Sequence, residues 1–128
     1  MKFTSGEHWE FAIDSVLGNL RRFYADGESG DWFAMTAGAR WKNGNFFMSP
    51  RVEIYNDNSG ATLQALGGPT APQRIDSETL TIGLDFGGGL ELRLEGRYDH
   101  SSAQTFVAND NDAVDSQITT TLGALYDF

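Results

Sequence analysis

Alternation of apolar and polar residues is the main pattern in this chain, and the run from Leu90 to Asp99 shows it best. Its even positions hold leucine, glycine or tyrosine, and every odd position is charged. Successive side chains of a β-strand point to opposite faces, whereas a helix turns 100° per residue and cannot keep alternate positions together. The run therefore predicts a strand with one apolar and one charged face.

The same period of two recurs along the chain and predicts six strands. Tight hairpins are expected at 42–45, which reads Lys-Asn-Gly-Asn, and at 87–89, which is three glycines. Pro50 lies within the third strand, where it removes a backbone donor and usually marks an edge or a bulge. The strands are expected near residues 7–17, 31–41, 46–56, 78–86, 90–99 and 116–128, the last running to the final residue.

The connections between these strands alternate between short and long. The long ones, 18–30, 57–77 and 100–115, are polar. In an antiparallel meander alternate connections lie at the same end of the sheet, so the long loops are expected at one end and the short turns at the other. Bacterial outer-membrane barrels have short periplasmic turns and long outer loops. The pattern favours one all-β domain over 1–128, an antiparallel up-and-down transmembrane β-barrel.

Aromatic residues on the apolar face gather near the end with the short turns. Transmembrane barrels carry aromatic girdles at the membrane interfaces. The end of the chain, with its aromatic last residue and apolar residues at alternate positions before it, is similar to the insertion signal of bacterial outer-membrane proteins. The expected membrane-interface and assembly-signal residues are Trp9, Trp41, Phe46, Phe86, Leu122, Tyr126 and Phe128.

The opposite face carries charges of both signs, which a barrel would place along a water-filled lumen. Seven acids exceed four arginines there, so the pore is expected to favour cations. The alternative is that these charges are the solvated surface of a soluble sheet. The expected pore-lining residues are Glu10, Asp14, Arg40, Arg51, Glu53, Asp85, Glu91, Arg93, Glu95, Arg97 and Asp99.

Composition narrows the function further. The 128 residues include 18 acids and 9 Lys or Arg, a net charge of −9, which argues against a nucleic-acid partner. No apolar run approaches the length of a membrane helix, and the first residues contain no apolar signal segment. Cysteine is absent, which removes disulfides, thiolate metal sites and cysteine nucleophiles.

Enzymatic chemistry finds little support in the sequence. The only histidines, His8 and His100, lack metal-ligand spacing, and the glycines at 87–89 lack the lysine and the helix of a phosphate loop. The acidic stretch 109–115 is rich in oxygen ligands but lacks the glycine and terminal glutamate of a calcium loop. No catalytic residue, cofactor or metal is expected.

Four stretches resemble the C-terminal part of the OmpL-like second group of a β-barrel porin family. They are residues 51–60, 94–101, 115–117 and 122–128. The resemblance implies a porin of the bacterial outer membrane that lets small hydrophilic solutes or ions diffuse passively. It also implies contact with outer-membrane lipid and recognition of the C-terminal strand by the barrel assembly machinery. A member would be longer, so this chain is expected to form the last six strands.

Six strands are too few to close a transmembrane barrel by themselves. A barrel needs about eight, and lipid tolerates no open sheet edge. We therefore expect either preceding strands or other copies of the chain to complete the barrel. The alternative function is a soluble all-β barrel or sandwich that folds its apolar face inward around a small apolar ligand.

Overall fold

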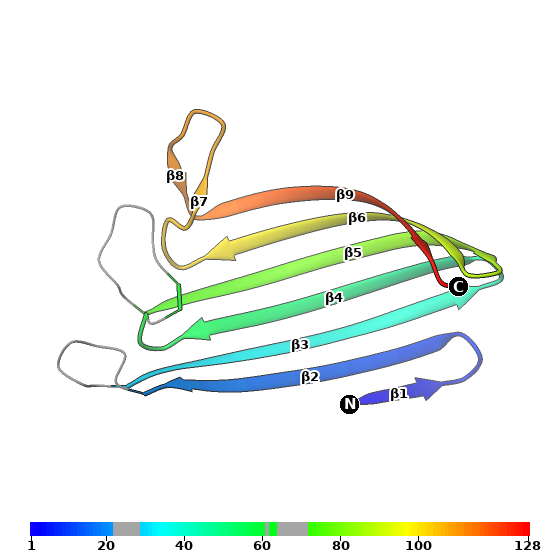
Figure 1. The fold of residues 1–128 in the computed structure, drawn as a ribbon, viewed down its shortest axis with the longest axis horizontal. Coiled ribbons are helices and arrows are strands. Elements are labelled where there is room, and N and C mark those ends of the chain that lie inside the picture. Colours follow the sequence, from blue (N-terminus) through cyan, green and yellow to red (C-terminus); the bar gives the residue numbers. More distant parts are fainter. Residues whose placement is uncertain (22–28, 61, 64–71) are drawn as a thin grey trace.

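The structure is a computed structural model that describes residues 1–21, 29–60, 62–63 and 72–128. Seven strands form one sheet in the order β1-β2-β3-β4-β5-β6-β9, in which all neighbours are antiparallel (Figure 1). A separate hairpin pairs β7 (Phe106–Val107) with β8 (Ala113–Val114). The sheet strands are β1 (Lys2–Ser5), β2 (Trp9–Leu20), β3 (Gly30–Asn43), β4 (Phe46–Asp57), β5 (Gln73–Gly87), β6 (Leu90–Ser101) and β9 (Ser116–Tyr126).

The six predicted strands correspond to β2 to β6 and β9, but the predicted number and several bounds are wrong. The sheet has a seventh strand, β1, and the predicted loop 100–115 contains the β7–β8 hairpin. Strand β5 begins at Gln73, within the predicted loop 57–77, and β9 ends at Tyr126 instead of the last residue. Residues 22–28 and 64–71 of the predicted loops lie outside the described residues.

The two ends of the sheet differ in their connections. Short turns at 6–8, 44–45 and 88–89 lie at one end, and the longer connections leave from the other (Figure 1). Gly44 has a φ of +58°, which a glycine adopts without strain. The turns are tied to neighbouring strands, since the amide of Lys42 donates to the carbonyl of His8 at 2.9 Å. At the end with the short turns, the connections are therefore short and hydrogen-bonded to neighbouring strands.

Pro50 lies in a central strand, so the expected edge or bulge is wrong. Pairing between β3 and β4 is interrupted beside Pro50 and resumes with the same register at Gly38 and at Trp41. The Ser49 hydroxyl donates to the carbonyl of Ala39 at 3.0 Å, so this acceptor is satisfied without the backbone donor that proline lacks. The register shift in the sheet lies elsewhere, between Asp85 and Gly87.

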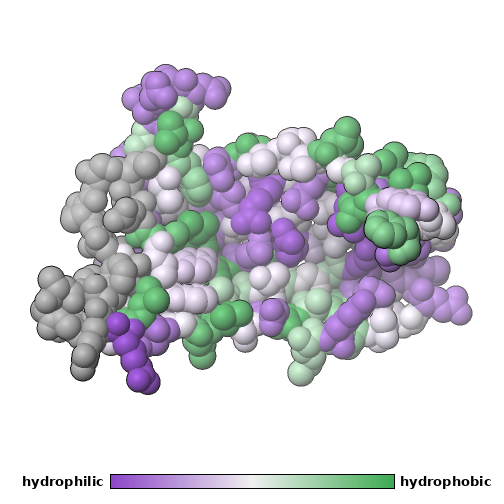
Figure 2. Space-filling model, in the orientation of Figure 1, coloured by the Kyte–Doolittle hydropathy of each residue, from purple (hydrophilic) through white to green (hydrophobic). Residues whose placement is uncertain are grey.

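The sheet has no covering layer among the described residues. Phe47 is the one buried hydrophobic residue there, and large apolar side chains such as Leu80, Leu94 and Ile118 are exposed on one face. Figure 2 shows hydrophilic side chains gathered over the middle of the sheet, with hydrophobic ones along its upper and lower margins. Strands β1 and β9 are the two edges, so the sheet is open. No helix in the described ranges is long and apolar enough to cross a membrane.

Candidate functional site

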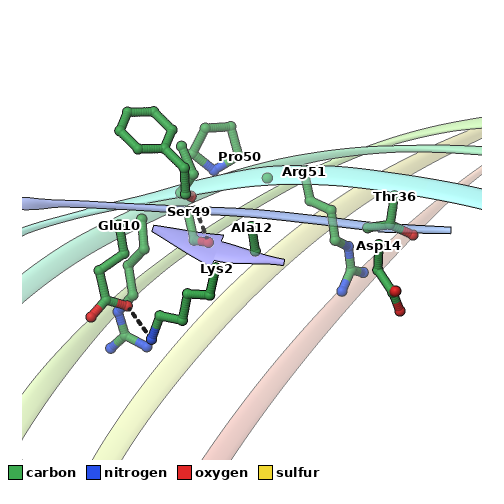
Figure 3. A pocket seen from close by; sticks show the side chains of 12 residues that line it. Lys2, Glu10, Ala12, Asp14, Thr36, Ser49, Pro50 and Arg51 are labelled. Carbon is green, nitrogen blue, oxygen red and sulfur yellow. Dashed lines mark hydrogen bonds and ion pairs between the residues drawn. The ribbon is translucent and has the colours of Figure 1, made fainter. Parts of the chain in front are cut away.

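The residues expected to line a pore lie on the same side of the sheet, which we call the charged face. The register pairs Glu10 with Arg40, and the Arg97 side chain reaches Glu53 two strands away. Pro50 points away from this face, whereas its neighbours Ser49 and Arg51 point into it (Figure 3). The charged face contains Glu10, Asp14, Arg40, Arg51, Glu53, Asp85, Glu91, Arg93, Glu95, Arg97 and Asp99.

A hydrogen-bonded network centred on Arg97 and Asp99 joins four strands in the half of the sheet nearer the long connections. Asp99, with only 4% of its surface exposed, accepts hydrogen bonds from Ser77 Oγ at 2.5 Å, Arg97 Nε at 2.8 Å and Gln117 Nε2 at 2.9 Å. The Arg97 guanidinium also donates to Glu53 at 2.6 Å and to Ser77 at 3.0 Å. The network fixes the positions of these charges, because each is held by several directed bonds.

A stack of side chains lies on the charged face near the short turns. The Phe47 ring covers Gly83, where an added Cβ would lie only 2.3 Å from the ring. The Arg40 guanidinium lies over the other side of the ring, 3.9 Å from its centroid, and pairs with Glu91 at 2.9 Å. Arg93 also pairs with Glu91. The Phe47 ring therefore makes a cation–π contact with Arg40, the arginine that pairs with Glu91.

Two lysines outside the predicted set of pore-lining residues also lie on this face. Lys2 pairs with Glu10 at 2.9 Å, and Lys42 pairs with Asp85 at 2.5 Å. The register also places the buried Asp57, at the end of β4, on this side. Eight acids and six basic residues therefore share the charged face, and the excess of negative charge expected from the sequence was too large. Lys42 could have been predicted, because it follows Trp41 of the apolar face and must therefore point to the charged face. Lys2 could not, because its strand is too short to predict.

A hollow of 310 Å³ opens on the charged face over β2, β3 and β4 (Figure 3). Ala12 and Gly38 form its floor, because the methyl group of alanine and the missing side chain of glycine leave space between larger neighbours. Asp14 and Arg51 lie at one end of it, and the paired Lys2 and Glu10 at the other. The hollow offers charged groups of both signs to a small molecule.

The predicted interface residues lie on the opposite side of the sheet, which we call the apolar face. Trp9 lies opposite Trp41, whose ring meets Phe46 edge-on at 6.2 Å, all near the short turns. The Leu122 side chain is 81% exposed, and Phe128 lies beyond the end of β9, stacked on Tyr126 at 6.3 Å. Phe86 is half-exposed beside the register shift.

Additional aromatic contacts extend this face to the first strand. Phe3 stacks on Phe11 with centroids 5.3 Å apart, and Phe11 stacks on Trp9 at 5.8 Å. Phe3 was not among the predicted interface residues because no strand was expected at 2–5. The aromatic group near the short turns therefore reaches the β1 edge of the sheet.

The two histidines and the acidic stretch 109–115, which the sequence offered for catalysis or metal binding, form no catalytic or metal-binding group among the described residues. His8 Nδ1 is 2.8 Å from the backbone carbonyl of Lys42, and His100 faces Ser116 across β6 and β9. Over the described ranges, no three His, Asp or Glu side chains are arranged to hold a metal ion. This includes the acidic stretch 109–115.

Comparison with models of known protein families gives a match over the whole chain. A family model described as "putative beta-barrel porin-2, OmpL-like" matches residues 1–128. Comparisons with curated proteins and with solved structures give no match. The family match spans the sheet, both of its faces and the stretches that carry the resemblance noted from the sequence. The chain therefore belongs to the OmpL-like beta-barrel porin-2 family.

Proposed function

We propose that the protein is an outer-membrane porin that lets small hydrophilic solutes and ions diffuse through a charged, water-filled lumen. The observation that carries this proposal is the contrast between the two faces of an uncovered sheet. A soluble sheet buries its apolar face, whereas this one leaves Leu80, Leu94 and Leu122 exposed. Lipid is the solvent that such a face requires.

The height of the apolar face fits a bilayer. On β6 it extends from Leu90 to Tyr98, and a tilted strand crosses the hydrocarbon core with about 9–11 residues. Above this level β5 carries Asp76 and Arg74 on the same side, and they pair with each other at 2.7 Å. Charged groups thus replace apolar ones where the membrane would end.

The charged face would form the pore wall. Its ion pairs hold charges of both signs in place, so solutes would be selected by size and by the local field without turnover or cofactor. Because eight acids and six bases share this face, and Asp57 among them is fully buried, cation preference from this wall would be weak. The proposal requires strands beyond this sheet to close the lumen, from a longer chain or from other copies. The barrel assembly machinery would recognise the end of the chain, where Tyr126 and Phe128 stack.

The proposal is tested with a pair of arginine substitutions in the protein refolded in lipid vesicles. Leu94→Arg places a charge on the apolar face and should destabilise the protein by about 2–4 kcal/mol. Thr121→Arg is the matched control, since it adds the same side chain to the charged face of the neighbouring strand and should cost well under half as much.

Conductance across planar bilayers provides the functional measurement. The wild-type protein should form steady KCl-conducting pores, and Thr121→Arg should change their conductance. A monodisperse protein that stays monomeric in plain buffer, forms no pore and tolerates Leu94→Arg would contradict the proposal. That result would favour the soluble ligand-binding module.

A further inference from the structure

The hollow over β2, β3 and β4 contains two charged groups, Asp14 and Arg51, that the networks of the charged face leave unpaired or only loosely paired. At its other end Lys2 and Glu10 neutralise each other, and Arg40 is held by Glu91 and by the Phe47 ring. These groups already have partners, so they offer little to a solute.

Asp14 has no basic partner among the described residues. Its carboxylate accepts one hydrogen bond, from the backbone amide of Ser15 at 3.0 Å. In the register it lies opposite Thr36, which also lines the hollow. The Asp14 carboxylate therefore has free lone pairs facing the hollow (Figure 3).

Arg51 is engaged only loosely. Its Nε atom lies 3.6 Å from Glu53, is buried and makes no hydrogen bond. Glu53 is instead bonded to Arg97 at 2.6 Å. The Arg51 guanidinium thus retains donors for a carboxylate, for which its planar fork is suited.

The placement of two opposite charges beside one hollow suits a molecule that carries both charges. Asp14 is on β2 and Arg51 on β4, so the strands that carry them are two spacings apart, roughly 10 Å. Along the strands, Thr36 opposite Asp14 and Gly38 opposite Arg51 are two residues apart. Gly38 lies between them opposite Arg51, and no ion pair joins Asp14 to Arg51. A lone cation would be repelled by Arg51 and a lone anion by Asp14, whereas a zwitterion satisfies both.

We propose that this hollow is a subsite for small zwitterionic solutes, in which Asp14 binds the ammonium group and Arg51 the carboxylate. The proposal rests on the proposed pore function and names a solute class for it. Both partners are partly exposed to water, so binding is weak and the solute can leave again, as permeation requires.

Permeation into proteoliposomes tests the subsite with two probes of equal atomic composition. Glycine is a zwitterion and its isomer glycolamide is uncharged. For the wild-type protein we expect glycine to enter about three to five times faster at low concentration, with a rate that saturates. Asp14→Asn and Arg51→Gln should each bring the ratio of the two rates close to one.

Matched controls separate the subsite from a general effect of charge. Glu95→Gln removes a carboxylate from the same face on β6, where Thr81 is its hydrogen-bond donor, and should leave the ratio unchanged. Ala12→Leu fills the floor of the hollow and should lower the ratio. Thr119→Leu, in the same row of the sheet, should lower both rates alike.

The outcomes distinguish the two proposals. Equal entry of glycine and glycolamide through a conducting wild-type pore would overturn the subsite and leave the pore intact. An equal loss of preference in Glu95→Gln and Asp14→Asn would also overturn it, since the general field would then be the cause. Failure of both probes and of KCl to pass would overturn the proposed function and the subsite with it.

Discussion

Replacing Phe47 with alanine should destabilise the protein more than its place on a wet, charged face would suggest. The ring is 1% exposed, between Gly83 and the Arg40 guanidinium. Burying a phenylalanine side chain contributes about 1.5–3 kcal/mol. A cation over the ring adds about 0.5–2 kcal/mol. Water can enter the space left behind, so we add no cost for an empty cavity and expect a loss of about 3 kcal/mol.

Urea unfolding of the protein in lipid vesicles measures this loss, with fluorescence of the three tryptophans as the signal. A double-mutant cycle with Arg40→Met isolates the contact between guanidinium and ring, for which we expect a coupling of about 1 kcal/mol. Phe47→Leu keeps an apolar side chain and should recover part of the loss. A cost below about 1 kcal/mol for Phe47→Ala, or no coupling with Arg40, would refute this account of the stack.

Three further predictions concern the ends of the sheet and the pore. Deleting Phe128 should reduce insertion in cells more than refolding in detergent, because only insertion in cells uses the barrel assembly machinery. Equal effects would contradict the assembly-signal role and support only a role for Phe128 as an interface anchor. Reversal potentials in a KCl gradient should show weak cation preference that fades as salt rises, and anion preference at low salt would contradict it. Asp57 is fully buried and accepts bonds from Thr62 and from the Leu63 amide, at 2.6 to 2.8 Å. Asp57→Ala should therefore speed hydrogen exchange of the Thr62 and Leu63 amides at least tenfold, or about 1.4 kcal/mol.

Most strands were predictable because period two is a local property of the sequence. The run Leu90–Asp99 specifies β6 and both of its faces without reference to any other strand. The start of β5 was missed because Arg74 and Asp76 occupy the apolar side there, above the level of the apolar residues. Strand β1 was missed because its four residues pair with only a short part of β2.

The side on which each charge lies was predictable, but its partner was not. Arg40 and Glu91 are 51 residues apart and meet across two intervening strands, which depends on the register of the whole sheet. Phe46 and Phe47 are adjacent in a strand, so one of them must face the charged side. That Phe47 is buried there depends on Gly83 of the next strand, which no local pattern reveals.

The direction of the edge strands limits how a lumen can close. Seven strands with only antiparallel neighbours leave β1 and β9 running the same way, both toward the short turns. A ring of identical copies inserted in one orientation would therefore set β9 of one copy beside β1 of the next as a parallel pair. An odd number of further strands between these edges would instead keep every pair antiparallel and make the total even. Because the chain has no cysteine, single cysteines placed on β1 and β9 would show by disulfide formation whether such a parallel seam exists.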